Sequence, residues 1–320
     1  MTQPPKSYEN VQYEFRPAKQ VERRMLLHTF QCLMGVGFPI SDYKYTGLGS
    51  IYFVDFIIFH RYLGIKKFLS VEVSQDIAKR VDFNTPFACV DVVIGDIAEH
   101  IPRLSPDMKH ILWLDFDHIL TEEVLTAVYL ASVQLSPGSI LLVTVDVEPP
   151  GRPQDGLTKW NPRWWKNYFV REARQYIWAN ATPKDFGLDS LPKANARLIE
   201  AAISRGMVAR TDLSFYPMFN FVYADGHRML SLGGMIGTQA DGRNLRALNR
   251  ETLYFLRASL TTAPYEIVVP KVTRKERLYL DRNMPCRDKW TPPHFELSWD
   301  KVACYRSIYK YYPAYTEMFL

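Results

Sequence analysis

Residues 43–72 read YKYTGLGSIYFVDFIIFHRYLGIKKFLSVE and have the pattern of one strand, a tight turn, a helix and a second strand. The first strand ends at Thr46 and is followed by Gly-Leu-Gly, which lets the backbone turn tightly and approach a ligand closely. Ser50 is a favoured N-cap, so we expect a helix over 51–63. The apolar run 67–73 is expected to form a buried strand. This unit predicts a parallel sheet.

The same alternation of apolar runs and helical patterns continues to about residue 148, and it indicates further βαβ units. Two later apolar runs are joined by Asp-Gly-His-Arg, and a turn with Asp-Gly between such runs is typical of a β-hairpin. We therefore expect five parallel strands followed by an antiparallel pair. The expected later strands are 90–96, 111–117, 140–147, 219–224 and 229–236.

The flanking segments are expected to be helical or irregular. After a loosely held arm over 1–15, apolar residues recur at helical spacing from Pro17 to Gly35, with Lys19, Arg23 and Arg24 on the wetter side. Residues 149–165 are rich in Pro, Gly and Trp and are expected to form a long loop. Further helices are expected at 166–179, 193–205 and 249–259.

We expect three parts: an N-terminal arm and helix, a central ligand-binding domain and a C-terminal extension. Their expected ranges are 1–40, 41–240 and 241–320. The extension becomes basic and rich in tyrosine toward its end, and its role does not follow from the sequence.

The composition of the 320 residues is that of an ordinary globular protein, with 47% hydrophobic and 23% charged residues, which excludes a disordered or fibrous chain. The net charge of +5 permits an anionic partner without requiring one. The most apolar stretch, 51–63, is too short to cross a bilayer, and no signal peptide is recognisable. The four cysteines are far apart in sequence, as in a reduced cytoplasmic protein without structural zinc. We therefore expect a cytoplasmic location.

Three features of the sequence would meet at the carboxyl edge of the sheet, where open parallel sheets bind ligands. The Gly47-Leu48-Gly49 turn is followed 25 residues after its first glycine by Glu72, which could bind ribose hydroxyls. Asp96 ends the third strand and could bind the exocyclic amine of adenine. Together they predict a nucleoside cofactor. The structural alternative is that both acids only cap the helices that follow.

The glycine spacing favours one cofactor over another. A dinucleotide site carries a third glycine, as in G-x-G-x-x-G, and here Tyr52 occupies that position. The expected hairpin also replaces the sixth parallel strand of a dinucleotide fold. We therefore favour S-adenosylmethionine (SAM) over NAD.

Five segments of the sequence resemble the bacterial putative O-methyltransferase family, which belongs to the class I (Rossmann-like) SAM-dependent methyltransferases. They are Tyr45–Phe56, Leu69–Glu72, Phe83–Phe87, Gly95-Asp96 and Trp113–Asp117. The resemblance covers about residues 20–240. It implies an α/β fold with helices on both faces of a mostly parallel seven-stranded sheet, in which the last two strands form an antiparallel hairpin.

The resemblance also implies roles for individual residues. Gly47 and Gly49 would belong to the cofactor loop, with Glu72 on the ribose, Asp96 near the adenine and Asp115 at the methyl-transfer end. The complete set of expected cofactor contacts is Thr46, Gly47, Gly49, Ser50, Glu72, Val73, Gly95, Asp96 and Asp115.

The expected catalytic residues are Asp115, Asp117 and His118. Asp115 would hold the methionine amine or the acceptor, and Asp117 beside His118 would be the base. We expect only one of the two aspartates to face the cofactor, unless the chain turns at once. No metal is expected; the less favoured alternative is Mg²⁺ held by Asp115, Asp117 and Asp146. His60 is expected to be structural.

The methyl acceptor stays open between a small molecule and a nucleic acid, and a homo-oligomer is also considered. A SAM- or nucleotide-binding module without chemistry is the alternative to an enzyme. Residues 159–168 alternate aromatic and basic side chains, which suits a lid or base stacking as well as a loop packed back on the core. The Asp-Pro-Pro-Tyr type of motif of amino-methylating DNA enzymes is absent, which disfavours adenine N6 as the target.

Overall fold

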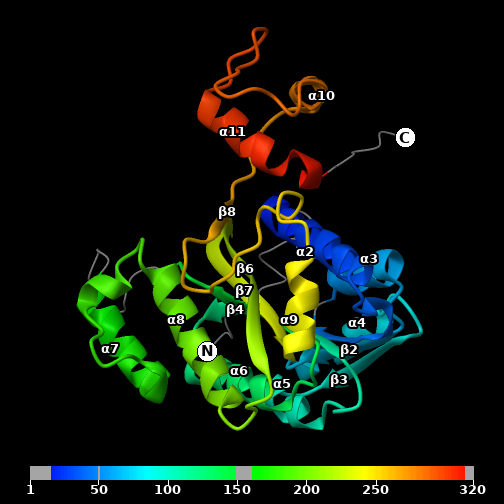
Figure 1. Cartoon of the computed structure of the whole chain (residues 1–320), viewed down its shortest axis with the longest axis vertical. Coiled ribbons are helices and arrows are strands. Elements are labelled where there is room, and N and C mark those ends of the chain that lie inside the picture. Colours follow the sequence, from blue (N-terminus) through cyan, green and yellow to red (C-terminus); the bar gives the residue numbers. More distant parts are fainter. Residues whose placement is uncertain (1–15, 50, 149–160, 314–320) are drawn as a thin grey trace.

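A single sheet of eight strands organises the computed structural model over the parts of the chain that it describes, residues 16–49, 51–148 and 161–313 (Figure 1). The strand order is β3-β2-β1-β4-β5-β7-β6-β8. The strands are β1 (Lys44–Leu48), β2 (Lys67–Glu72), β3 (Val90–Ile94), β4 (His110–Ile119), β5 (Ser139–Asp146), β6 (Ser214–Asp225), β7 (His227–Gly237) and β8 (Tyr265–Ile267).

The strand directions confirm the predicted α/β architecture. Strands β1 to β5 are parallel, and β7 runs antiparallel to both β5 and β6. The order reverses between β1 and β4, which places a ligand-binding crevice at their carboxyl ends. Strand β8 pairs in parallel with β6 and was not predicted, because three residues are too few to produce a strand pattern.

Helices cover both faces of the sheet, as expected. The α-helices are α2 (Pro17–Gly35), α3 (Val54–Leu63), α4 (Ala78–Phe83), α5 (Ile97–His100), α6 (Glu122–Gln134), α7 (Pro162–Ala173), α8 (Leu191–Met207), α9 (Gln239–Arg246), α10 (Arg274–Arg282) and α11 (Trp299–Ile308). Short 3-10 helices are η2 (Ile40–Asp42), η3 (Gln75–Ile77), η4 (Ile101–Arg103), η5 (Arg174–Tyr176), η6 (Pro183–Phe186) and η7 (Tyr309–Tyr311). Figure 1 shows α10 and α11 at one end of the molecule, away from the sheet.

Alternate residues of β4 belong to two separate hydrophobic cores. Ile111 and Trp113 pack with α2 and α3, whereas Leu112 and Leu114 pack with α6 and α8. This follows from the two-residue period of a strand, which sends successive side chains to opposite faces. Asp115 therefore continues the row of Ile111 and Trp113 and faces α2.

Helix α2 was predicted at the correct position, but its basic residues do not lie on a solvent-exposed side. Lys19 is 0% and Arg23 is 3% exposed, and Arg24 is partly buried. The helix contacts α3, β6, β8 and η7, so more than one side of it is covered. Asp225 at the end of β6 accepts hydrogen bonds from the backbone N–H groups of Ala18 and Lys19, at 3.0 and 2.8 Å, and so fixes the start of the helix.

Two expected helices start elsewhere. The helix predicted over 51–63 begins only at Val54, because Phe53 adopts a left-handed conformation with φ 47° and buries its ring. The helix predicted over 166–179 is α7, which begins at Pro162, inside the expected loop, because the Asn161 side chain caps its first turn. The helix predicted over 193–205 is confirmed as α8.

The helix predicted at 249–259 is wrong. The chain forms turns there, although Leu253, Phe255 and Leu256 are buried at spacings that suggested a helix. The N–H of Arg257 donates to the carbonyl of Met218 in β6, at 2.8 Å, instead of continuing a helical ladder. Packing on the sheet therefore outweighs the local pattern.

Two further findings concern the chain as a whole. None of the helices in the described residues combines the length and apolar character that crossing a membrane requires. All four cysteines are free. The expected domain ranges stay a prediction, and the expected arm over 1–15 lies outside the described residues.

Candidate active site

A cavity of about 920 Å³ lies at the carboxyl ends of the parallel strands, where the strand order reverses. Its volume is within the range of small-molecule and cofactor sites. All three expected catalytic residues line it, as do six of the nine expected cofactor residues: Gly49, Glu72, Val73, Gly95, Asp96 and Asp115. Thr46 and Gly47 lie inside β1 and do not line it, and Ser50 is outside the described residues.

Gly49 packs directly against Glu72 at the base of the cavity. Its N–H donates a hydrogen bond to the carbonyl of Val71, and a Cβ at position 49 would lie only 2.6 Å from the Cβ of Glu72. Glu72 is 8% exposed, and its Oε1 accepts a hydrogen bond from the N–H of Ser74 at 2.8 Å. The carboxylate is therefore fixed at the cavity wall rather than turned into bulk water.

Gly49→Ala is expected to lower the free energy of unfolding by about 1–3 kcal/mol, because the new methyl group forces the backbone of Glu72 to move. Urea denaturation measures this change. Gly35→Ala is the matched control: no atom lies within 4 Å of its added methyl group, so it should be neutral or slightly stabilising. Equal effects of the two substitutions would contradict the role of Gly49.

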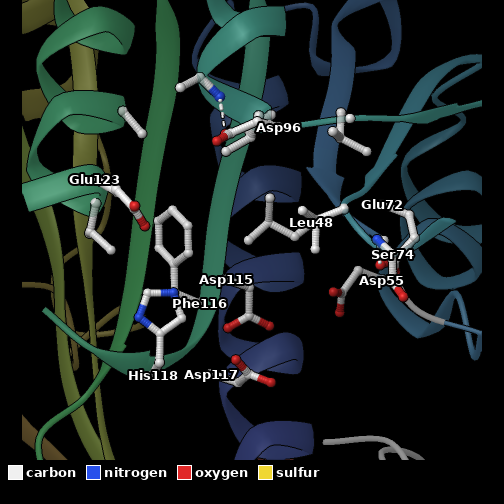
Figure 2. A pocket seen from close by; sticks show the side chains of 18 of the residues that line it. Leu48, Asp55, Glu72, Ser74, Asp96, Asp115, Phe116, Asp117, His118 and Glu123 are labelled. Atoms are coloured by element: carbon white, nitrogen blue, oxygen red, sulfur yellow. Dashed lines mark hydrogen bonds between the residues drawn. The ribbon is translucent and has the colours of Figure 1, made fainter. Parts of the chain in front are cut away.

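Asp96 caps a helix and also lines the cavity. Its Oδ1 accepts a hydrogen bond from the N–H of Ala98, at 2.8 Å, so it caps α5, and it is exposed to the cavity (Figure 2). Nearby, the N–H of Gly95 donates to the carbonyl of Glu72 at 2.9 Å and joins the ends of β2 and β3. Val73 is 76% exposed and offers an apolar surface for a ligand to cover.

Asp115 forms a buried ionic cluster with α2. Nζ of Lys19 lies 2.7 Å from Oδ1 of Asp115 and 3.0 Å from Oε2 of Glu22. The same ammonium group donates to the hydroxyl of Tyr223 at 3.2 Å and lies 4.3 Å from the ring centre of Trp113. Lys19 thus neutralises carboxylates on two elements and joins α2 to β4 and β6.

The pKa values of this cluster follow from burial and from the charges that face one another. Burial alone would raise the pKa of Asp115, but the ammonium group of Lys19 outweighs it and holds that pKa below its ordinary value. Burial would lower the pKa of Lys19, but Asp115 and Glu22 raise it above its ordinary value. Burial raises the pKa of Glu22 despite Lys19. Asp115 is therefore an anion near neutral pH and a poor proton acceptor.

A second ion pair borders the same end of the cavity. Nε of Arg23 donates to Oδ1 of Asp55, in the first turn of α3, and both residues line the cavity. The Nη1 atom of Arg23 is buried and makes no hydrogen bond within the described parts of the chain. This guanidinium edge therefore fits an anionic group of a ligand.

Asp115 and Asp117 both line the cavity, and Figure 2 shows them together in front of α2. The expectation that only one faces the cofactor is therefore wrong, because side chains two residues apart in a strand point to the same face. Asp117 and His118 are exposed. Nδ1 of His118 lies 2.9 Å from the carbonyl oxygen of Ile119. Since a carbonyl only accepts, the neutral ring carries its proton on Nδ1 and leaves Nε2 as a base.

The alternative of a metal held by three aspartates is not supported by their positions. Asp146 does not line the cavity; its carboxylate accepts hydrogen bonds from His227 Nδ1 at 2.9 Å and from the N–H of Glu148 at 2.6 Å. Among the described residues, no three His, Cys, Asp or Glu side chains are grouped as metal ligands would be. His60 is structural, as expected, with Nδ1 2.8 Å from the carbonyl oxygen of Ile65.

The aromatic segment expected as a lid or a packed loop is described from residue 161 onward. Trp165 and Phe169 are buried in the core beside α6 and α8, which agrees with the packed alternative. Tyr168 donates to the carbonyl of Leu120 at 3.3 Å. From α7, Glu172 lines the cavity.

Four residues at or beside the cavity were not predicted as site residues: Arg16, Lys19, Arg23 and Asp55. Three of these are basic residues at positions 16, 19 and 23, and this i, i+3, i+7 spacing puts them on one helix face. That spacing was the available signal, since such a row suggests a shared anionic partner. Asp55 lies in the first turn of α3, at the edge of the sheet where α/β folds hold their ligands.

Comparison of the chain with known proteins identifies one matching protein family. The family model described as "Putative O-methyltransferase" matches residues 11–320. No curated protein matches the chain. Solved structures similar to it include a putative O-methyltransferase from Klebsiella pneumoniae (11% identity, 73% of this chain and 83% of that chain, TM-score 0.37). A second is the O-methyltransferase TomG from Streptomyces achromogenes in complex with SAM (14% identity, 67% of this chain and 79% of that chain, TM-score 0.37). A third is Trm1 from Pyrococcus horikoshii with S-adenosyl-L-methionine (16% identity, 75% of this chain and 61% of that chain, TM-score 0.44).

The family match covers nearly the whole chain, and the parallel strands followed by an antiparallel β5-β7-β6 arrangement agree with it. The chain therefore belongs to the putative O-methyltransferase family, within the class I SAM-dependent methyltransferase fold.

Proposed function

We propose that this protein is a SAM-dependent methyltransferase whose cofactor lies across the carboxyl ends of β1 and β2. The observation that carries the proposal is Glu72, a nearly buried carboxylate pressed against Gly49 and facing a cavity that extends to Asp115, Asp117 and His118. Glu72 would bind the ribose hydroxyls, and Asp96 the adenine amine. Val73 would pack on the base.

Bound SAM would supply a methyl group that is activated by its sulfonium charge. The residues of this chain would orient it and handle the acceptor's proton. Asp115 stays anionic beside Lys19, which suits binding an ammonium group better than taking a proton. Nε2 of His118, with Asp117 beside it, is the better base for an acceptor hydroxyl.

The charges around the cavity bear on the acceptor. Two arginines line it, Arg16 and Arg23, against eight carboxylates: Asp55, Glu72, Asp96, Asp115, Asp117, Glu122, Glu123 and Glu172. Such a rim repels a phosphate backbone, so we favour a small-molecule acceptor with a hydroxyl or amine over a nucleic acid. A nucleic-acid acceptor would require binding that weakens steeply with salt.

Isothermal titration calorimetry with SAM, S-adenosylhomocysteine and NAD tests the cofactor. We expect binding of the first two and none of NAD, because Tyr52 stands where a pyrophosphate site needs its third glycine. A protein that binds only NAD would contradict the proposal.

A non-catalytic SAM-binding module is the second candidate. It differs from an enzyme in that a variant with Asp117→Asn and His118→Ala would bind SAM and keep its biological activity. A methyl-transfer screen over metabolites, RNA, DNA and proteins would identify the acceptor. A cytoplasmic location and a homo-oligomeric state also stay predictions.

A further inference from the structure

We propose that Arg23 binds the α-carboxylate of the methionine part of the cofactor, while Asp115 binds its ammonium group. The inference rests on the proposed function and adds to it the residues that recognise the amino-acid end of the cofactor. These residues come from α2 and β4 rather than from the glycine turn.

The Arg23 guanidinium has a buried donor atom without a partner among the described residues. Arg23 is 3% exposed and lines the cavity, and its Nη1 lacks a hydrogen-bond partner within the described residues. Leaving a buried charged donor unpaired is costly, and a ligand carboxylate removes that cost. Asp55 accepts a hydrogen bond from Nε, which lies on a different edge of the guanidinium from Nη1. The ion pair therefore fixes the orientation of the guanidinium and leaves its Nη1 edge able to bind a second carboxylate.

The N-terminal end of α3 lies beside this guanidinium. Val54, Asp55 and Phe56, the first turn of α3, line the cavity, and the N-cap residue Phe53 gives them no side-chain hydrogen bond. The N–H groups of a helix start favour a negative charge. Asp55 balances the charge of Arg23, so what this corner offers an anion is the unpaired Nη1 edge of Arg23 beside the start of α3.

The carboxylate of Asp115 lines the same cavity as Arg23. Asp55 and Asp115 both line the cavity, and the charges of both carboxylates act on the Arg23 guanidinium. The amino-acid end of SAM carries one carboxylate and one ammonium group. Arg23 and Asp115 match these two charges, and Arg16 is a weaker candidate for the carboxylate because Asp225 lies 3.9 Å from its Nε.

The test compares SAM with decarboxylated SAM, which keeps the nucleoside, the sulfonium and the amine but lacks the carboxylate. By calorimetry, the wild-type protein should bind SAM about 10- to 100-fold more tightly than the decarboxylated compound. Arg23→Gln should remove this preference by weakening SAM binding by that factor, with binding of decarboxylated SAM changed by less than about threefold.

Two further variants separate binding from structure. Arg23→Gln/Asp55→Asn keeps the charge balance of the cavity and should lose the preference in the same way. Arg24→Gln is the matched control, since Arg24 is the next residue of α2, bonds to the carbonyl of Tyr312 at 2.6 Å and does not line the cavity. It should keep the preference. Thermal melting of each variant verifies folding.

The outcomes are distinct. Wild-type protein that binds both compounds equally would overturn the role of Arg23 and leave the proposed function intact. The same holds if a folded Arg23→Gln variant keeps the preference or loses both compounds equally. Wild-type protein that binds neither compound would overturn the proposed function, and this inference with it.

Discussion

Lys19→Met is expected to lower the free energy of unfolding by about 3–5 kcal/mol, because it leaves the fully buried carboxylate of Glu22 and the partly buried carboxylate of Asp115 without their cation. Methionine preserves much of the length of lysine, so the loss of packing is small. Urea denaturation followed by circular dichroism measures the change. The effect exceeds that of an ordinary surface charge because the Lys19 side chain is completely buried.

The same substitution should change how stability depends on pH. In the wild-type protein the pKa of Asp115 is below its ordinary value, so its stabilising contribution is present above the unfolded-state pKa and is lost as pH falls through the folded-state pKa. Without Lys19, burial raises the pKa values of Asp115 and Glu22. A carboxyl group whose pKa is raised in the folded state destabilises that state increasingly as pH rises above the unfolded-state pKa. The loss of stability in Lys19→Met should therefore be larger at pH 8 than at pH 4–5.

The control is Lys66→Met, which removes an exposed lysine and should change stability by less than about 0.5 kcal/mol. Lys19→Met/Asp115→Asn removes one cation and one anion together and should recover part of the loss. A Lys19→Met deficit that is small and independent of pH would show that the cluster does not stabilise α2 on the sheet.

Much of the fold could be predicted because it depends on short sequence patterns that act on neighbouring residues. The capping residue Thr121 and the Asp225-Gly226 hairpin turn each impose a backbone conformation on a few neighbouring residues, so they could be found without tertiary information. Gly47, expected in a turn, instead lies inside β1. The position of Glu72 also followed, because the mostly apolar segment before it has the pattern of a buried strand.

The parts that could not be predicted depend on contacts far apart in sequence. Lys19 looked like a solvated residue because its partner Asp115 is 96 residues away. The segment near Arg257 has a helical pattern, but a hydrogen bond to β6 determines its conformation. The shared face of Asp115 and Asp117 does not depend on such distant contacts, since the two-residue period of a strand was sufficient to predict it.

Glu72→Ala is expected to weaken binding of S-adenosylhomocysteine by about 100-fold or more. Two ribose hydroxyls would each lose a hydrogen bond to a charged group, each worth about 1.5–3 kcal/mol, and every 1.4 kcal/mol is about tenfold in Kd. Glu72→Gln keeps an acceptor for the N–H of Ser74, which Glu72 binds at 2.8 Å, and should lose less. Calorimetry measures both, and Glu99→Ala is the control because Glu99 is exposed and does not line the cavity.

The ribose assignment has its own test in a cofactor analogue that lacks the 2′-hydroxyl. If Glu72 binds that hydroxyl, the 2′-deoxy analogue of S-adenosylhomocysteine should bind the wild-type protein more weakly than the parent compound, but should bind Glu72→Ala equally well, since the partner is already gone. Equal discrimination by both proteins would mean that Glu72 acts only on its own backbone neighbours. Its near burial against Gly49 would then stabilise the turn without recognising the sugar.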